Sequence, residues 1–166
     1  MAKITGIIDE FLPATRFIGK RYSEIGHWNE WWEGFFFEKL ETTIDENGGL
    51  PNWESAGGYV GMEKRREGIL TDYYIGMFAT PETPIPEGFI CIDFDRTNLG
   101  TCVIYGKEGE VHDVLDKCRK ALTDRDYTIK ETPEGAVYSF ENCLCPRYTD
   151  PDENGNITLY YSYFVI

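Results

Sequence analysis

The stretch FIGKRYSEIGHWNEWWEGFFFEKL, residues 17–40, decides the fold, because residues 104–127 follow the same plan 87 positions later as IYGKEGEVHDVLDKCRKALTDRDY. In both stretches a strand-like run ends in Gly-Lys, and an amphipathic segment follows within a few residues. At this offset three aromatic residues align with ordinary core residues at i, i+3 and i+7 of one helix face: Trp28 with Leu115, Trp31 with Cys118 and Phe35 with Leu122. The pattern predicts two equivalent strand-helix units.

Further strand candidates extend the repeat on both sides. They are ITGIIDEF at 4–11 and FICIDFDR at 89–96 upstream, and YYIGMF at 73–78 and LYYSYF at 159–164 downstream. The unit is then strand, strand, helix, strand, strand, present twice over roughly residues 3–80 and 88–166. We expect one α+β domain, residues 1–166, in which an antiparallel sheet packs on two helices and a ligand groove lies where the copies meet.

The charge of the chain limits its partners. The formal net charge is -13, and the one basic cluster, Lys64–Arg66, is short and flanked by Glu63 and Glu67. Direct binding to nucleic acid needs a basic stripe, and anionic membrane surfaces repel such a chain, so we expect neither partner. The first residues, MAKITGIIDEFLP, match neither a signal peptide nor a membrane span, and a cytoplasmic location is expected.

The sequence predicts no metal site, no cofactor site and no familiar catalytic motif. Its five cysteines are an odd number without a C-x-x-C pair, which supports neither a disulfide framework nor a zinc site. Phosphate-loop, dinucleotide and H-E-x-x-H motifs are missing. His27 and His112 each stand near a helix start, where a surface or cap role is the simpler interpretation.

The aromatic residues of 27–40 exceed what one buried stripe needs. Trp32, Phe36 and Leu40 form a second row at i, i+4 and i+8 beside the first. Some rings must pack in the core, and the surplus row is expected to face the groove, a partner chain or the long loop that carries Trp53. Strand residues are further candidates for the wall: Tyr73, Tyr74, Phe78, Tyr105, Tyr138, Tyr148, Tyr160 and Tyr161. Of each adjacent tyrosine pair, only one member can point inward.

The repeat, the helix opening HWNEWW, the stretch DYYIGMFATPETPIPEGF and the segment VYSFENCLCPRY together resemble the GyrI-like small-molecule-binding family. That family includes effector-binding domains of multidrug-sensing transcriptional regulators, free-standing binders, a gyrase-inhibitor protein and hydrolases of cyclopropane-bearing xenobiotics. The resemblance implies an aromatic cavity between the helices and the sheet, with a glutamate that aligns with Glu141. It also implies a stand-alone binder or the partner of a separate regulator, since no helix-turn-helix precedes Lys3.

Alternation along residues 136–145 places Glu141 on one face with Val137, Ser139, Cys143 and Cys145. If helices cover that face, a carboxylate there needs a cation or hydrogen-bond donors to compensate its lost hydration. A cationic guest would supply that compensation, and surrounding rings would add cation–π attraction. The alternative is an exposed glutamate on the outer face of the sheet, or a bulge that reverses the facing.

The candidate ligand-binding residues are Glu141, Trp28, Trp31, Trp32, Phe35, Phe36, Tyr73, Tyr74, Tyr105, Tyr138 and Tyr148. The expected function is binding of xenobiotic molecules that are planar and aromatic or hydrophobic and cationic. One alternative is a hydrolase of reactive xenobiotics with Glu141 as general base. Another is a protein-interaction module that masks a DNA-associated protein with its acidic surface.

Overall fold

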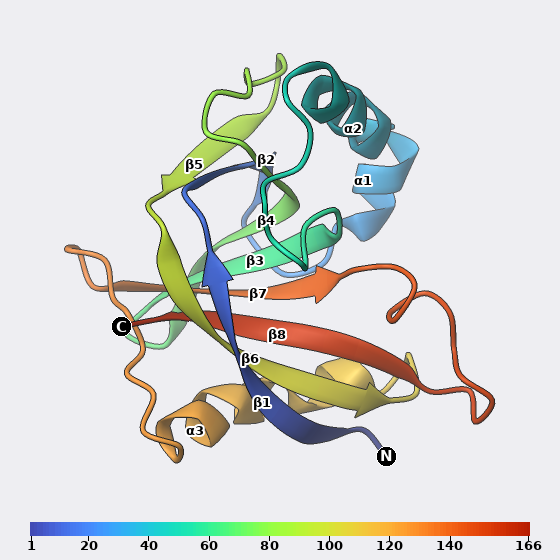
Figure 1. Ribbon diagram of the computed structural model, residues 1–166, viewed down its shortest axis with the longest axis vertical. Coiled ribbons are helices and arrows are strands. Elements are labelled where there is room, and N and C mark those ends of the chain that lie inside the picture. Colours follow the sequence, from blue (N-terminus) through green and yellow to red (C-terminus); the bar gives the residue numbers. More distant parts are fainter.

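All residues, 1–166, are described by a computed structural model, in which eight antiparallel strands form one sheet with helices on one face (Figure 1). The elements are β1 (Lys3–Leu12), β2 (Thr15–Tyr22), α1 (Trp28–Glu33), α2 (Phe36–Glu46), β3 (Tyr59–Arg66), β4 (Ile69–Ala79), β5 (Ile90–Phe94), β6 (Thr97–Gly106), the 3-10 helix η1 (Val111–Lys117), α3 (Cys118–Thr123), β7 (Ala136–Cys143) and β8 (Ile157–Val165). None of the helices is both long enough and apolar enough to cross a lipid bilayer.

The sheet order, β1-β6-β8-β7-β3-β4-β2-β5, reads the same from either end when each strand is exchanged for its counterpart in the other copy. The predicted duplication of strand, strand, helix, strand, strand is therefore confirmed. Each copy gives its first strand to the other copy, because β1 pairs with β6 and β5 pairs with β2. The two copies meet at the central β3–β7 pair.

The alignment of the two Gly-Lys dipeptides is wrong for the strands. Gly19 and Lys20 lie inside β2, whereas Gly106 is the last residue of β6 and Lys107 lies beyond it. The sheet register instead pairs Leu12 with Thr97 and Thr15 with Phe94, so the hairpins correspond at a spacing of 82 residues. β2 and β6 are equivalent strands, but β6 is longer, so the two Gly-Lys dipeptides stand at different positions along them.

The buried side chains form three clusters, two beneath the helices and one on the opposite face of the sheet. One lies beneath α1 and α2 and includes Trp31, Leu40 and Ile44. A second lies beneath η1 and α3. The third, with Phe78 and Phe140, fills the opposite face of the sheet. Figure 1 shows α1 and α2 near one end of the sheet and α3 near the other, so the middle of this face lies between the two helical layers.

The aromatic helix is broken, which the sequence pattern did not predict. Gly34 and Phe35 separate α1 from α2, and Phe35 adopts a left-handed conformation with φ 54°. The break changes the helical phase, so the expected row through Phe35 ends at Trp31. In the second copy Cys118 and Leu122 are buried together with Val111 and Val114, whereas Leu115, which aligns with Trp28, is only partly buried.

Candidate functional site

Glu141 lies at the centre of the helix-bearing face. It stands in the middle of β7, directly opposite Gly61 of β3, where the two copies of the repeat meet. Its neighbour Phe140 points into the core on the opposite face, whereas Val137 packs under η1 and α3. The alternation of the strand therefore aims the Glu141 carboxylate between the two helical layers, and the residue is only 7% exposed.

Both oxygens of the Glu141 carboxylate have a partner. The Tyr73 hydroxyl donates to Oε1 over 3.2 Å, and the Nε2 atom of His112 lies 2.5 Å from Oε2. Because an ionised carboxylate only accepts, Nε2 is the donor in this pair. The indole of Trp28 donates to the Tyr73 oxygen over 3.1 Å. Residues from α1, β4, β7 and η1 thus form one chain of hydrogen bonds.

A glycine makes room for this arrangement. A Cβ atom built on Gly61 would lie 2.3 Å from the Tyr73 hydroxyl and 2.6 Å from Oε1 of Glu141. Both distances are shorter than any van der Waals contact, so a larger residue forces the two side chains to move. Gly61 therefore permits the Tyr73–Glu141 hydrogen bond on the buried face of the sheet.

The carboxylate changes the protonation of its surroundings. The hydrogen bond from His112 to Glu141 raises the pKa of the imidazole above its ordinary value, although partial burial opposes the shift. Burial, together with the nearby negative charge of Glu141, raises the pKa of the Tyr73, Tyr148 and Cys143 side chains. These three groups stay neutral at physiological pH, and the imidazolium is favoured at His112.

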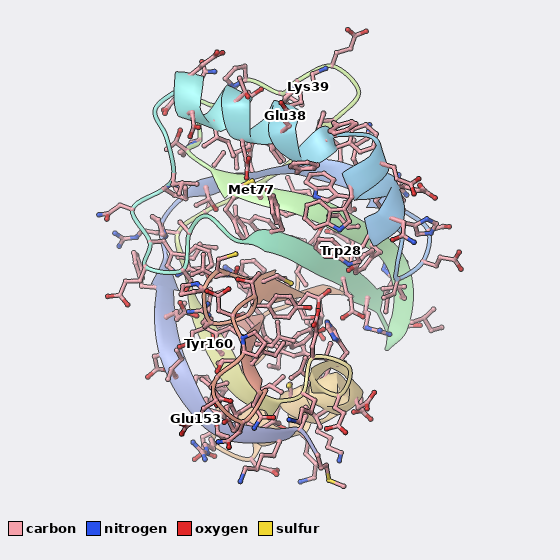
Figure 2. All side chains as sticks on the ribbon, turned by 90° about the vertical axis from the view of Figure 1, so that its right-hand side faces the viewer. Trp28, Glu38, Lys39, Met77, Glu153 and Tyr160 are labelled. Carbon is pink, nitrogen blue, oxygen red and sulfur yellow. The ribbon has the colours of Figure 1, made fainter.

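A cleft of about 350 Å³ opens above Glu141. Its walls combine side chains from both copies: Trp28, Trp32, Tyr59, Glu108, His112, Glu141, Cys143, Cys145, Tyr148 and Thr149. The ring centroids of Trp28 and Trp32 are 6.1 Å apart, and that of Tyr59 is 5.1 Å from Trp32. Figure 2 shows Trp28 on the inner side of the helices, whereas Glu38 and Lys39 lie on the outer side. The cleft has aromatic walls, and the Glu141–His112 pair lies at its floor.

A second cavity of about 540 Å³ adjoins the cleft and is more polar. Glu141 and His112 line both spaces, together with Glu63, Arg65 and Arg119 in the second. Glu63 is buried, but Arg65 donates to its carboxylate over 2.6 Å and Tyr161 donates to its other oxygen. This second carboxylate is thus already compensated by the protein's own cation.

Four of the candidate residues meet at the cleft: Trp28, Trp32, Tyr148 and Glu141. Tyr73 lies behind them and reaches Glu141. The other candidates lie elsewhere: Trp31 and Phe36 pack in the core beneath the helices, Phe35 is 63% exposed, Tyr74 and Tyr138 lie on the opposite face, and Tyr105 donates to Asp152 at the surface. The additional strand aromatics also lie away from the cleft walls: Phe78 in the opposite core, Tyr160 against Arg147, and Tyr161 at Glu63.

Sequence reasoning missed Tyr59 and His112. Tyr59 begins a strand in which Gly61 and Glu63 share its face, and this alternation is the signal that predicts an inward ring. His112 stands beside the buried stripe of the second helical segment, and no spacing in the sequence relates it to Glu141. His112 is exposed, as expected of a surface residue, but it also pairs with the buried carboxylate of Glu141, and that contact was not expected.

No protein-family model and no curated protein sequence matches the chain, but solved structures share its fold. A putative bacterial transcription regulation protein from Staphylococcus aureus MU50 has a TM-score of 0.64 at 12% identity, covering 96% of this chain and 97% of that one. SAV2435, solved with tetraphenylphosphonium, gives 0.61 at 14% identity, with 98% and 94% covered. EcmrR, solved in a complex with DNA, gives 0.59 at 11% identity, and the match covers 96% of this chain and 57% of EcmrR. At these identities the likeness establishes the α+β fold.

Proposed function

We propose that the protein binds hydrophobic organic cations and planar aromatic molecules in the cleft above Glu141, as a member of the GyrI-like small-molecule-binding family. The observation that carries the proposal is a buried carboxylate at the floor of an aromatic-walled cleft of about 350 Å³. A cleft of this size and mostly apolar lining, with a few convergent polar groups, is typical of small-molecule sites.

The chemistry of the cleft favours a positively charged guest. A carboxylate that has lost its hydration gains most from a cation that brings little hydration of its own, such as a delocalised or quaternary one. The faces of Trp28, Trp32 and Tyr59 add cation–π attraction of about 0.5 to 2 kcal/mol each. The net charge of -13 raises the local concentration of cations around the whole molecule.

The fold shared with SAV2435 supports a specific probe. SAV2435 is solved with tetraphenylphosphonium, a bulky aromatic cation. Tetraphenylphosphonium carries a permanent charge shielded by four rings, which matches an aromatic cleft with a buried anion. It is therefore the first ligand to test on this chain.

Fluorescence titration tests the proposal, because Trp28 and Trp32 line the cleft and report on an occupant. We expect saturable quenching by tetraphenylphosphonium and weaker binding of triphenylphosphine oxide, a neutral aromatic molecule. Glu141→Gln is expected to weaken binding of the cation by about tenfold to a hundredfold, or roughly 1.4 to 2.8 kcal/mol. It should change the affinity of the neutral molecule far less.

Glu108→Gln is the matched control, since Glu108 lies at the exposed rim of the same cleft and the substitution removes the same charge. Equal losses in both variants would show that only the overall acidity attracts cations. Failure of every aromatic cation and planar compound to bind the wild type would overturn the proposal.

One observation favours hydrolysis as a second candidate function. His112 and Tyr73 both hydrogen-bond to Glu141, so a base, a proton carrier and a phenol donor line or adjoin one cleft. This set suits water addition to a strained electrophile bound between the rings. The test is product analysis of cyclopropane-bearing aromatic electrophiles with wild type and Glu141→Gln. Turnover that disappears in the variant while binding persists establishes the enzyme, and unchanged compound in both assigns a binder.

A further inference from the structure

The position that a cationic guest needs is already filled by a side chain of the protein. Oε1 of Glu141 accepts from Tyr73, and Oε2 accepts from His112 over 2.5 Å. A cation that approaches from the cleft therefore meets a carboxylate whose two oxygens both already accept a hydrogen bond. The tyrosine is buried and held by Trp28, whereas the His112 side chain is 43% exposed and has no other hydrogen-bond partner. Of the two partners, the imidazole is the one that can leave.

His112 also divides the space beneath the helices. The aromatic cleft of about 350 Å³ and the polar cavity of about 540 Å³ share two lining residues, His112 and Glu141. The imidazole therefore stands at the boundary between them, on a 3-10 helix whose hydrogen bonds are weaker than those of an α-helix. Rotation of this one side chain toward solvent would leave Oε2 of Glu141 without its partner, at the boundary of both spaces.

Resting on the proposed function, we propose that His112 is a displaceable internal counter-ion of Glu141. A guest with a permanent positive charge takes the place of the imidazolium, which swings out and releases its proton. Competition with His112 then makes the site selective among cations. It excludes cations too weakly bound to compete with the imidazolium, and it admits bulky aromatic cations that bring ring contacts as well as charge.

The groups around His112 agree with this role. The residues that face or adjoin it are Glu141 and Cys143 from β7, Tyr148 from the following loop, Glu108 from the loop before η1, Asp113, Asp116 and Arg119 from its own helical segment, Glu63 and Arg65 from β3, Tyr73 from β4, and Tyr161 and Tyr163 from β8. Arg65 already compensates Glu63, and the tyrosines are neutral. Glu141 is the only carboxylate in direct contact with the ring, so displacement removes the main cause of its raised pKa.

The sign of the pH effect follows from linkage. His112 has a raised pKa while it pairs with Glu141, and a lower one once a cation has displaced it. Binding therefore releases a proton, and affinity for a permanent cation rises with pH between the two values, then stays constant above the higher one. The total increase in affinity for the cation is about tenfold for each unit that separates the two pKa values. A neutral guest that leaves the pair intact shows no such rise.

Calorimetric titration with tetraphenylphosphonium from pH 5.5 to 8.5 tests the proposal. Repeating it in two buffers of different ionisation enthalpy counts the protons released. We expect the wild type to bind more tightly as pH rises, with up to one proton released near the pKa of His112. His112→Ala should bind the cation more tightly than the wild type at low pH, with a flat pH profile and no released proton.

Two further variants serve as controls. His112→Gln retains a neutral donor and should also be flat with pH, which guards against misfolding of the alanine variant. His27→Ala removes the other histidine, which pairs with Glu24 and Glu30 at the surface, and should leave the slope unchanged. Wild-type binding that depends on Glu141 but is flat with pH would overturn the counter-ion role and leave the proposed function standing. A slope that survives in both His112 variants would also overturn it. Loss of all cation binding in wild type and variants alike would instead remove the proposed function itself.

Discussion

Gly61 leaves the space in which the Tyr73 hydroxyl and the Glu141 carboxylate meet. Gly61 and Glu141 face each other across the central strand pair, where the two copies of the repeat join. At this position the first copy has no side chain and the second has a carboxylate. The carboxylate and the Tyr73 hydroxyl occupy the space that a Cβ on Gly61 would take. A repeat that is symmetrical in its backbone thus holds an asymmetric site.

Gly61→Ala tests this packing. The new methyl group would overlap the Tyr73 hydroxyl and Glu141, so we expect a loss of about 1 to 3 kcal/mol in the free energy of unfolding, typical of an overpacked interior. Binding of tetraphenylphosphonium should weaken as well, because the carboxylate is displaced. Denaturant unfolding and fluorescence titration measure the two effects. Gly6→Ala on β1, where no atom lies within 4 Å of the added methyl group, is the matched control. Equal effects of the two substitutions would contradict the packing role.

Single residues of the site were predictable to different degrees. Strand alternation and the family resemblance together placed Glu141 on the helix-bearing face, and that position is the one observed. Trp28 and Trp32 also reach the cleft, whereas the adjacent Trp31 is fully buried. Periodicity cannot separate a ring that lines a cavity from one that fills the core, because both lie on the same broad face of a helix. The His112 contact joins residues 29 positions apart and depends on tertiary packing alone.

At the level of elements, the aromatic residues on the two sides of the break between α1 and α2 have different surroundings. Before the break, Trp28 and Trp32 face the cleft. After it, Phe36 packs against the ring of Phe89 in the core. Phe35 lies at the break itself with φ 54°, a conformation that costs a non-glycine residue roughly 1 kcal/mol. Together with Trp31, which is buried before the break, these rings show one aromatic segment supplying both a core and a cavity wall.

Phe35→Asn is expected to stabilise the protein by up to about 1 kcal/mol, because asparagine tolerates the left-handed conformation better. The exposed ring of Phe35 loses its contact with the ring of Phe37, and cation binding should not change. Thermal unfolding and titration check both statements. By comparison, Phe36→Ala should destabilise, at the lower end of the roughly 3 to 5 kcal/mol typical of buried phenylalanine, since this ring is partly exposed. A destabilised Phe35→Asn variant would show that the ring contact outweighs the backbone strain.

The arrangement of elements was more predictable than their pairing. Two copies of strand, strand, helix, strand, strand follow from β-favouring runs and apolar stripes, and all eight strands are present. The exchange of β1 and β5 between the copies does not follow, because strand pairing is set by contacts between distant residues. The helix break was missed for a related reason: Gly34 alone is tolerated within a helix, and periodicity does not show that the Phe36 ring lies where a Cβ on Gly34 would stand.

On the scale of the whole molecule, the two copies are interlocked. The only ladder partner of β1 is β6, and the only one of β5 is β2, so each copy holds an edge strand of the other. The central β3–β7 pair also crosses between copies. The core on the face opposite the helices mixes Phe17 and Phe78 with Leu99 and Phe140. Neither copy has a complete sheet or a complete core by itself.

This interlocking predicts how the protein behaves when it is cut between Pro84 and Ile85, which are exposed in the segment joining the copies. Fragments 1–84 and 85–166, each produced alone, should lack cooperative unfolding, because each leaves one strand unpaired and exposes half of a shared core. Mixed together, they should form a one-to-one complex that binds tetraphenylphosphonium and whose stability rises with concentration. Light scattering, circular dichroism and fluorescence titration measure these outcomes. A monomeric fragment that unfolds cooperatively on its own would show that the copies are independent units, and the cleft at their junction would then be an interface between separable domains.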